Sequence, residues 1–115
     1  MIVHKTKLTP IDFHGLSILD FTAGIQGVSS SFAVIDVPPG VNHVRAKSNR
    51  SEKLYYVERG TVRFELDGNE NTLAEGDFCL VKQGQLFAYR NDRNATAKLI
   101  LVHTPPFDPE AEVFV

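Results

Sequence analysis

The sequence contains little of what several large protein classes require. Its single cysteine, Cys79, rules out a disulfide within the chain, and its apolar neighbours favour a small buried side chain. No apolar stretch approaches the length of a transmembrane helix, and the N-terminal residues lack an apolar core long enough for a signal peptide. We therefore expect a cytoplasmic protein with no membrane partner.

The chain also has no excess of charge of either sign. It is 115 residues long and carries 12 Lys and Arg against 14 Asp and Glu, which gives a net charge of −2. A nucleic-acid-binding domain is usually basic, overall or on one face. One basic run at residues 45–53 is a local exception, and it is equally typical of a solvated loop. We predict no nucleic-acid partner.

Several functional signatures are missing as well. The sequence has no glycine-rich phosphate loop, no serine–histidine–aspartate signature and no zinc-ligand spacing. No segment of ten residues shows the period of an amphipathic helix. Helical folds and the catalytic classes that depend on these motifs therefore have no support in the sequence.

The pattern that is present is a series of short strands separated by glycine and proline. In residues 61–66 apolar and charged side chains alternate strictly, after an aromatic-rich strand at 52–60. Asp67 and Gly68 then supply a tight hairpin turn. With 43% hydrophobic residues, the chain is predicted to form one all-β domain. Further strands are expected at residues 16–23, 29–37, 78–81, 86–90 and 97–103, whereas 41–51 shows no strand pattern.

Four glycines and one asparagine resemble the frame of the cupins, which are double-stranded β-helix (jelly-roll) barrels. The residues that match the two cupin motifs are Gly40, Gly60, Gly76, Gly84 and Asn91. The resemblance implies a cupin barrel with its motifs in residues 40–91, a single domain over 1–115 and a C-terminal tail at 104–115. It also implies that the segment 41–51 crosses the barrel mouth.

The metal ligands that this resemblance implies are absent. Cupins hold a divalent metal with three histidines and a glutamate. In this chain the corresponding positions carry Ala46, Ser48, Lys53 and Phe87. Only the serine hydroxyl is a ligand, and a weak one. We predict no metal at the usual position and no cofactor, with His43 and His103 as a weak alternative metal site.

Lys53 is the most informative single residue. It occupies an inward-facing position, so Tyr55 and Val57 should face inward too. Burial would disfavour its charged form and lower its pKa. The ammonium could bind an anionic or carbonyl oxygen, and a neutral amine could act as a base or Schiff-base nucleophile. Alternatively, Lys53 reaches solvent or pairs with a carboxylate such as Glu52 or Glu58.

Aromatic and histidine side chains complete the predicted site. Phe87 and Tyr89 share one strand face, and His103 shares the inward face of its strand with Leu99 and Leu101. These rings either line a small-molecule pocket or fill the barrel. The predicted ligand-binding residues are Arg45, Lys53, Tyr55, Phe87, Tyr89 and His103, and the catalytic candidates are Lys53, His103 and Tyr89.

Three functional hypotheses follow from these residues. The first is a metal-free barrel that binds a small molecule, and we expect it to prefer neutral-polar or anionic ligands over cations. The second is an isomerase- or lyase-type enzyme that acts on a sugar-like or carboxylate substrate through the three catalytic candidates. The third is a structural dimer whose barrel interior is filled.

The C-terminal tail is unusually apolar for a chain end. It finishes Ala111-Glu-Val-Phe-Val115, after two prolines that break regular structure. Burying side chains of this size is worth about 1.5–3 kcal/mol each. We predict that the tail docks on a second copy in a homodimer, with folding back onto its own barrel as the alternative.

Overall fold

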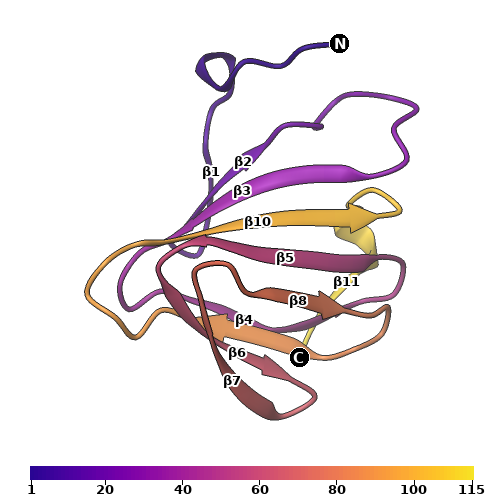
Figure 1. The fold of residues 1–115 in the computed structure, drawn as a ribbon. Helices are drawn as coiled ribbons and strands as arrows, with labels where there is room; N and C mark the ends of the chain where they lie inside the picture. Colours follow the sequence, from indigo (N-terminus) through magenta and orange to yellow (C-terminus); the bar gives the residue numbers. More distant parts are fainter.

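Two β-sheets packed against each other form the molecule, in a computed structural model that describes residues 1–115 (Figure 1). One sheet has six strands in the order β1-β2-β3-β10-β5-β8, and the other has five in the order β11-β4-β9-β6-β7. The strands are β1 (Ile11–Phe13), β2 (Leu16–Asp20), β3 (Ser31–Val37), β4 (Asn42–Ser48), β5 (Glu52–Arg59), β6 (Thr61–Leu66), β7 (Asn69–Ala74), β8 (Phe78–Val81), β9 (Phe87–Arg90), β10 (Ala97–Thr104) and β11 (Glu112–Phe114).

Neighbouring strands are antiparallel throughout, and the predicted all-β jelly-roll barrel is confirmed. The helical structure consists of two short 3-10 turns, η1 (Lys5–Lys7) and η2 (Pro109–Ala111). Neither is long or apolar enough to cross a membrane.

Two turns show why particular positions of the chain require glycine. At Gly60 the chain leaves β5 and enters β6 in the other sheet with φ at +82°, and a Cβ there would lie 2.8 Å from the Ala97 Cα. At the β6–β7 hairpin Asp67 and Gly68 both have positive φ, at 47° and 85°, as the sequence predicts for this tight turn.

The prediction of an irregular connection at residues 41–51 is wrong, because β4 occupies most of it. The register of β4 against β9 shifts between His43 and Ala46. Such a bulge interrupts the alternation of inward and outward side chains. The inward residues Ala46 and Ser48 are also small, so the segment does not carry the apolar period of a strand.

The C-terminal tail folds back onto its own barrel. β11 pairs with β4 in the same chain, in register Glu112↔Ser48, Val113↔Lys47 and Phe114↔Ala46. The yellow segment in Figure 1 shows this path across from the end of β10 to the second sheet. This position agrees with the alternative prediction, in which the tail folds back onto its own barrel. An apolar tail that already packs within its own chain is no longer a reason to expect a homodimer.

The inner faces of β5 and β10 set up one wall of the barrel. Lys53, Tyr55 and Val57 alternate inward on β5, and all three are buried. On β10 the inward face includes Leu99 and His103, as predicted. The register pairs His103 directly with Lys53, so these two polar side chains meet inside the barrel.

Candidate functional site

One end of the barrel interior is hollow and the other is filled. The cavity has a volume of about 330 Å³. Its lining residues are Ile11, Phe13, Ile18, Asp20, Ser31, Ala33, Ile35, His43, Lys53, Tyr55, Tyr89, Leu101, His103, Phe107, Pro109, Glu112 and Phe114. Further along the same strands the space is closed by buried side chains such as Val37, Val57 and Leu99. The interior therefore offers room for a ligand at one end only.

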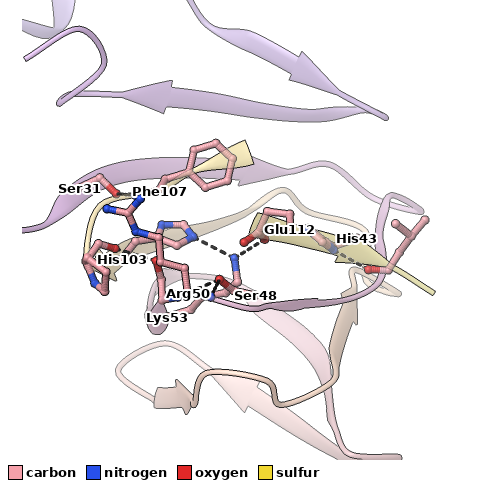
Figure 2. Close-up of polar contacts among 11 residues, drawn as sticks. Ser31, His43, Ser48, Arg50, Lys53, His103, Phe107 and Glu112 are labelled. Carbon is pink, nitrogen blue, oxygen red and sulfur yellow. Dashed lines mark hydrogen bonds and ion pairs between the residues drawn. The ribbon is translucent and has the colours of Figure 1, made fainter. Parts of the chain in front are cut away.

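A buried polar cluster lies on the wall of this cavity. Lys53 Nζ donates to Glu112 Oε1 at 2.6 Å and lies 2.9 Å from His103 Nε2. Figure 2 shows the ammonium of Lys53 on β5 between His103 on β10 and Glu112 on β11. Lys53 is 2% exposed and His103 5%, so the three groups meet away from bulk water.

The hydrogen bonds assign the protons within this cluster. An ammonium can only donate, so His103 Nε2 accepts from Lys53 and the ring carries its own proton on Nδ1. Burial lowers the pKa of Lys53, and the Glu112 carboxylate opposes that effect. Burial and the nearby Lys53 charge lower the pKa of His103 to about 3. The imidazole of His103 is therefore neutral at neutral pH.

His43 is a second neutral histidine on the cavity, and it presents a free acceptor. Its Nδ1 lies 2.6 Å from the backbone oxygen of Val44. A carbonyl only accepts, so Nδ1 carries the proton and Nε2 keeps its lone pair. Burial lowers the pKa of His43 to about 4. Its ring packs 4.9 Å from Phe87 and 5.2 Å from Tyr89, measured between centroids.

Two tyrosines provide the remaining polar groups at the inner end of the cavity. Tyr55 and Tyr89 are 2% and 3% exposed, with ring centroids 5.6 Å apart. Burial raises the pKa of both hydroxyls far above the usual value, so both stay protonated. The Tyr89 hydroxyl is buried beside the Tyr55 hydroxyl and makes no hydrogen bond of ordinary geometry. A buried unpaired hydroxyl costs free energy, and this one borders space where a ligand atom would satisfy it.

The residues at the cupin metal positions do not fit a divalent cation. Ala46 and Phe87 face each other across β4 and β9, and Lys53 Nζ lies 5.2 Å above the Phe87 ring. Ser48 Oγ is occupied, because it accepts from the amides of Arg50 and Ser51. A positive ammonium thus lies beside the position where the family places a cation.

His43 and His103, the weak alternative, do not form a metal site either. Nowhere in the chain do three His, Cys, Asp or Glu side chains come together as a metal-binding group. In addition, His103 Nε2 is engaged by Lys53, and His43 Nδ1 donates to Val44. Each histidine therefore has only one nitrogen free for another partner.

The structure brings four of the six predicted ligand-binding residues onto the cavity, namely Lys53, Tyr55, Tyr89 and His103. Phe87 is fully buried behind the lining, where it supports the His43 ring. Arg45 lies outside the barrel, where Nη2 makes an ion pair with Glu65 Oε1 at 2.8 Å. The prediction that Arg45 binds a ligand from the barrel mouth finds no support in this position, because Arg45 precedes the inward-facing Ala46 on β4 and points away from the interior.

Sequence reasoning missed the acidic partner of Lys53. It suggested Glu52 or Glu58, which are sequence neighbours, but both are exposed. Glu112 lies 59 positions away from Lys53. The available signal was that Glu112 is the one acid in the otherwise apolar last five residues, which were expected to pack on something. The aromatic cavity residues Phe13, Phe107 and Phe114 were also missed.

Comparison with known proteins gives matches at the level of family and fold. The model of the cupin domain family matches residues 33–103. Pac13, described as a nucleoside dehydratase, is 19% identical, with 100% of this chain and 90% of Pac13 covered and a TM-score of 0.85. KdgF from Halomonas sp. is 15% identical, with 93% and 94% covered and a TM-score of 0.81.

A predicted oxalate decarboxylase from Thermotoga maritima is 19% identical, with 91% of this chain and 99% of that chain covered and a TM-score of 0.80. No curated protein sequence matches the chain. At these identities the solved structures establish a shared fold.

Proposed function

Because this chain belongs to the cupin family, we propose that it binds one small ring-shaped molecule with hydroxyl or carbonyl groups in the barrel cavity, without a metal at the usual cupin position. The observation that carries this proposal is the buried cluster of Lys53, His103 and Glu112 on the cavity wall. Burying such groups costs free energy, and a ligand oxygen that meets them gives a reason to keep them there. The cupin fold serves many functions, so these side chains, and not the fold, support the choice.

The size of the cavity limits the ligand. Its volume of about 330 Å³ lies at the lower end of the usual range for ligand pockets, about 300–1,000 Å³. A molecule the size of a monosaccharide or nucleoside suits this space, whereas a peptide does not.

The electrostatics favour a ligand without net charge. The ammonium of Lys53 is matched by the Glu112 carboxylate at 2.6 Å. Both cavity histidines are neutral at neutral pH, because their pKa values are lowered to about 4 and about 3. Neutral polar ligands should therefore bind better than cations, and pairing with Glu112 weakens the attraction of Lys53 for anions.

Aromatic side chains favour a flat ring in the ligand. Phe13, Phe107 and Phe114 line the cavity together with His43, and such rings stack readily on a planar group. Pac13 from Streptomyces has been solved with uridine and is described as a nucleoside dehydratase. Uridine is thus a reasonable first ligand to test, and the unpaired Tyr89 hydroxyl is the group we expect to bond to it.

Calorimetric titration with uridine, other nucleosides and neutral monosaccharides tests this proposal. We expect at least one compound to bind with one site per chain and to raise the melting temperature. A matched panel of cationic compounds serves as the control and should not bind. Failure of every neutral ring compound at millimolar concentration would rule out the proposed ligand class.

A second candidate function, elimination of water from such a ligand, is favoured by the free Nε2 of His43. This neutral acceptor is placed to take a proton from a carbon next to a carbonyl group. The hydroxyl on the adjacent carbon would leave with a proton from the Lys53 ammonium or the Tyr89 hydroxyl. The electron pair of the broken C–H bond forms the carbon–carbon double bond, and one water is released. His43 then gives its proton to solvent, and Lys53 or Tyr89 regains a proton from solvent.

Mass spectrometry of incubated ligands tests this second function. The expected product is lighter by one water, and His43→Gln should abolish its formation while ligand binding remains. Equal product formation by the variant would exclude His43 as the base. Absence of product with every bound ligand would leave binding as the function.

A further inference from the structure

The inner face of β2 ends in a charged residue. Asp20 follows Ile18 at the two-residue period of a strand, and both side chains line the cavity. In the register with β3, Ile18 lies opposite Ile35 and Asp20 lies opposite Ala33. A carboxylate at an inward position of a sheet calls for an explanation, because removing a charge from water costs free energy.

Only one of the two carboxylate oxygens of Asp20 is used within the chain. Asp20 Oδ1 accepts from the Thr22 amide at 3.0 Å and from the Thr22 hydroxyl at 3.2 Å. No donor of the chain reaches Oδ2, and Asp20 takes part in none of the ion pairs. Thr22 therefore holds the carboxylate in place and leaves Oδ2 free to accept a hydrogen bond from a ligand.

The carboxylate of Asp20 also has no counter-charge in the cavity. On the lining, the charges of Lys53 and Glu112 balance each other in their ion pair. Burial lowers the pKa of His43 and of His103, so both rings are neutral at neutral pH. A negatively charged group of a ligand would be repelled at Asp20, whereas a neutral N–H or O–H group would find an acceptor.

A hydrogen-bond donor lies on the same face as this acceptor. Ser31 lines the cavity two positions before Ala33, which makes it a diagonal neighbour of Asp20, with Cβ atoms about 7 Å apart. Its Oγ accepts from the amide of Phe107 at 2.8 Å (Figure 2). Ser31 is 8% exposed, and its hydroxyl proton has no acceptor within the chain. A ligand group that both donates and accepts would satisfy the two residues together.

Asp20 lies at the outer end of the cavity, far from the tyrosines at the inner end. Asp20 and Tyr55 occupy one cross-strand row, and the apolar residues Ala33 and Leu101 lie between them. Three strand spacings of about 4.8 Å separate the two backbones by about 14 Å along the sheet. Tyr55 is 2% exposed, whereas Ile11, on the strand that adjoins β2, lines the cavity and is 53% exposed. The cavity therefore has polar groups at both ends and an apolar floor between them.

We propose that Asp20 and Ser31 form a second polar subsite, which binds a neutral ligand group that donates an N–H or O–H to Asp20 and accepts from Ser31. This inference rests on the proposed binding of a neutral ring compound in the cavity, and it adds a requirement to that function. The compound must carry polar groups at two ends, one for the tyrosines and one for Asp20. The imide of a pyrimidine base and the hydroxyl of a sugar both meet this requirement, whereas a negatively charged phosphate ester does not.

Calorimetric titration of the full chain with uridine and four analogues tests the subsite. Each analogue lacks one donor: 3-methyluridine lacks the imide N–H, and 2′-, 3′- and 5′-deoxyuridine each lack one hydroxyl. We expect the analogue without the donor to Asp20 to bind about ten- to hundredfold more weakly than uridine, as for a hydrogen bond to a charged group. A penalty for 3-methyluridine assigns the imide to Asp20, and a penalty for a deoxyuridine assigns a sugar hydroxyl.

The variant Asp20→Asn distinguishes this contact from contacts elsewhere in the cavity. The amide keeps an oxygen for Thr22 and replaces the free acceptor with a donor. The variant should bind uridine about ten- to hundredfold more weakly, and the penalty for the one analogue should disappear, because the two changes remove the same interaction. Asp12→Asn is the matched control, since Asp12 is exposed on β1 and does not line the cavity. It should leave the affinity for uridine unchanged.

Circular dichroism melting shows that each variant is folded, and Asp20→Ala serves as a second variant with the same expected loss. If the wild type and the folded Asp20 variants bind uridine equally, the subsite is overturned and the proposed function is not. The same holds if every analogue keeps its penalty in Asp20→Asn, or if the wild type binds another neutral ring compound but not uridine. If the wild type binds no neutral ring compound, the proposed function fails and the subsite fails with it.

Discussion

The two ends of the barrel interior are built by the same strands and yet differ in chemistry. On β5 the inward residues run from Lys53 at the cavity to Val57 at the filled end. On β10 they run from His103 to Leu99, four residues away on the same face. The register pairs Lys53 with His103 and Val57 with Leu99, so one end brings polar groups together and the other brings methyl groups together.

The filled end of the barrel contributes mainly to stability, whereas the cavity end is suited to binding a ligand. At the filled end every inward side chain gains free energy by burial. At the cavity end an ammonium, a carboxylate and two histidines are buried at a cost, and a hydroxyl is left unpaired. We therefore expect substitutions at the filled end to cost stability and those at the cavity end to cost ligand binding.

The largest effect is expected for Leu99→Ala. Leu99 is 1% exposed and lies between Ile35 and Val57 of the neighbouring strands. Removing its side chain should lower the free energy of unfolding by about 2–5 kcal/mol, with ligand affinity unchanged while the chain is folded. Urea denaturation measures the loss, and Val44→Ala at a 39%-exposed site is the control. A loss below that of the control would mean that the filled end is not the source of stability.

The next effect is a loss of stability in acid that originates at the cavity end. The pKa values of His43 and His103 are lowered to about 4 and about 3, against about 6.5 in an unfolded chain. The unfolded chain therefore binds more protons below pH 6.5, and stability falls as the pH falls. Between pH 7 and 5 we expect a loss of about 1–2 kcal/mol for each histidine.

Melting curves across this pH range measure that loss. Replacing both histidines with glutamine should flatten the dependence between pH 7 and 5. A slope that persists in the double variant would show that carboxylates, and not the cavity histidines, cause it.

The third-largest effect on stability is expected for Glu112→Gln. It keeps the shape and one acceptor oxygen but removes the charge opposite the buried Lys53 ammonium. We expect the free energy of unfolding to fall by about 1–3 kcal/mol, because the ammonium keeps its desolvation cost. Glu110→Gln, on an exposed neighbour in the same tail, is the control and should have no effect. Equal stability of the two variants would indicate that Lys53 is uncharged in the folded protein.

The smallest effect on stability is expected for Tyr89→Phe. Because the Tyr89 hydroxyl makes no hydrogen bond of ordinary geometry, and its neighbour is the Tyr55 hydroxyl, its removal should change the free energy of unfolding by less than about 0.5 kcal/mol. Ligand affinity should nevertheless fall about tenfold, since one net hydrogen bond is worth about 1 kcal/mol or slightly more. Calorimetry of both proteins measures this, and unchanged affinity would exclude a contact between Tyr89 and the ligand.

The fold was predictable from the sequence because its signals are local. Strict alternation in β6 and the positive φ at Asp67 and Gly68 each concern a few neighbouring residues. Positive φ at Gly60 likewise follows from the fixed place of glycine in the cupin frame. The inward direction of Lys53 and His103 needed only the two-residue period of a strand. The strand β4 was missed because its bulge removes that period.

The site was predictable only in part because its partners are distant in sequence. Which residue pairs with Lys53 depends on where β11 docks, and nothing near Lys53 carries that information. Arg45 was predicted to bind a ligand because its segment was expected to cross the barrel mouth, whereas that segment forms β4 and alternation along the strand points Arg45 outward.

The position of Glu112 on the last strand makes the site sensitive to proteolysis. β11 is held by three paired residues at the edge of a sheet, and the exposed Pro109 and Glu110 precede it. Cleavage there would remove a cavity wall and the counter-charge of Lys53, while β1 to β10 keep their pairings with one another. A ribosome likewise completes those ten strands before Glu112 emerges, 59 residues after Lys53. Ligand binding would thus report on whether β11 is present and still joined to the barrel.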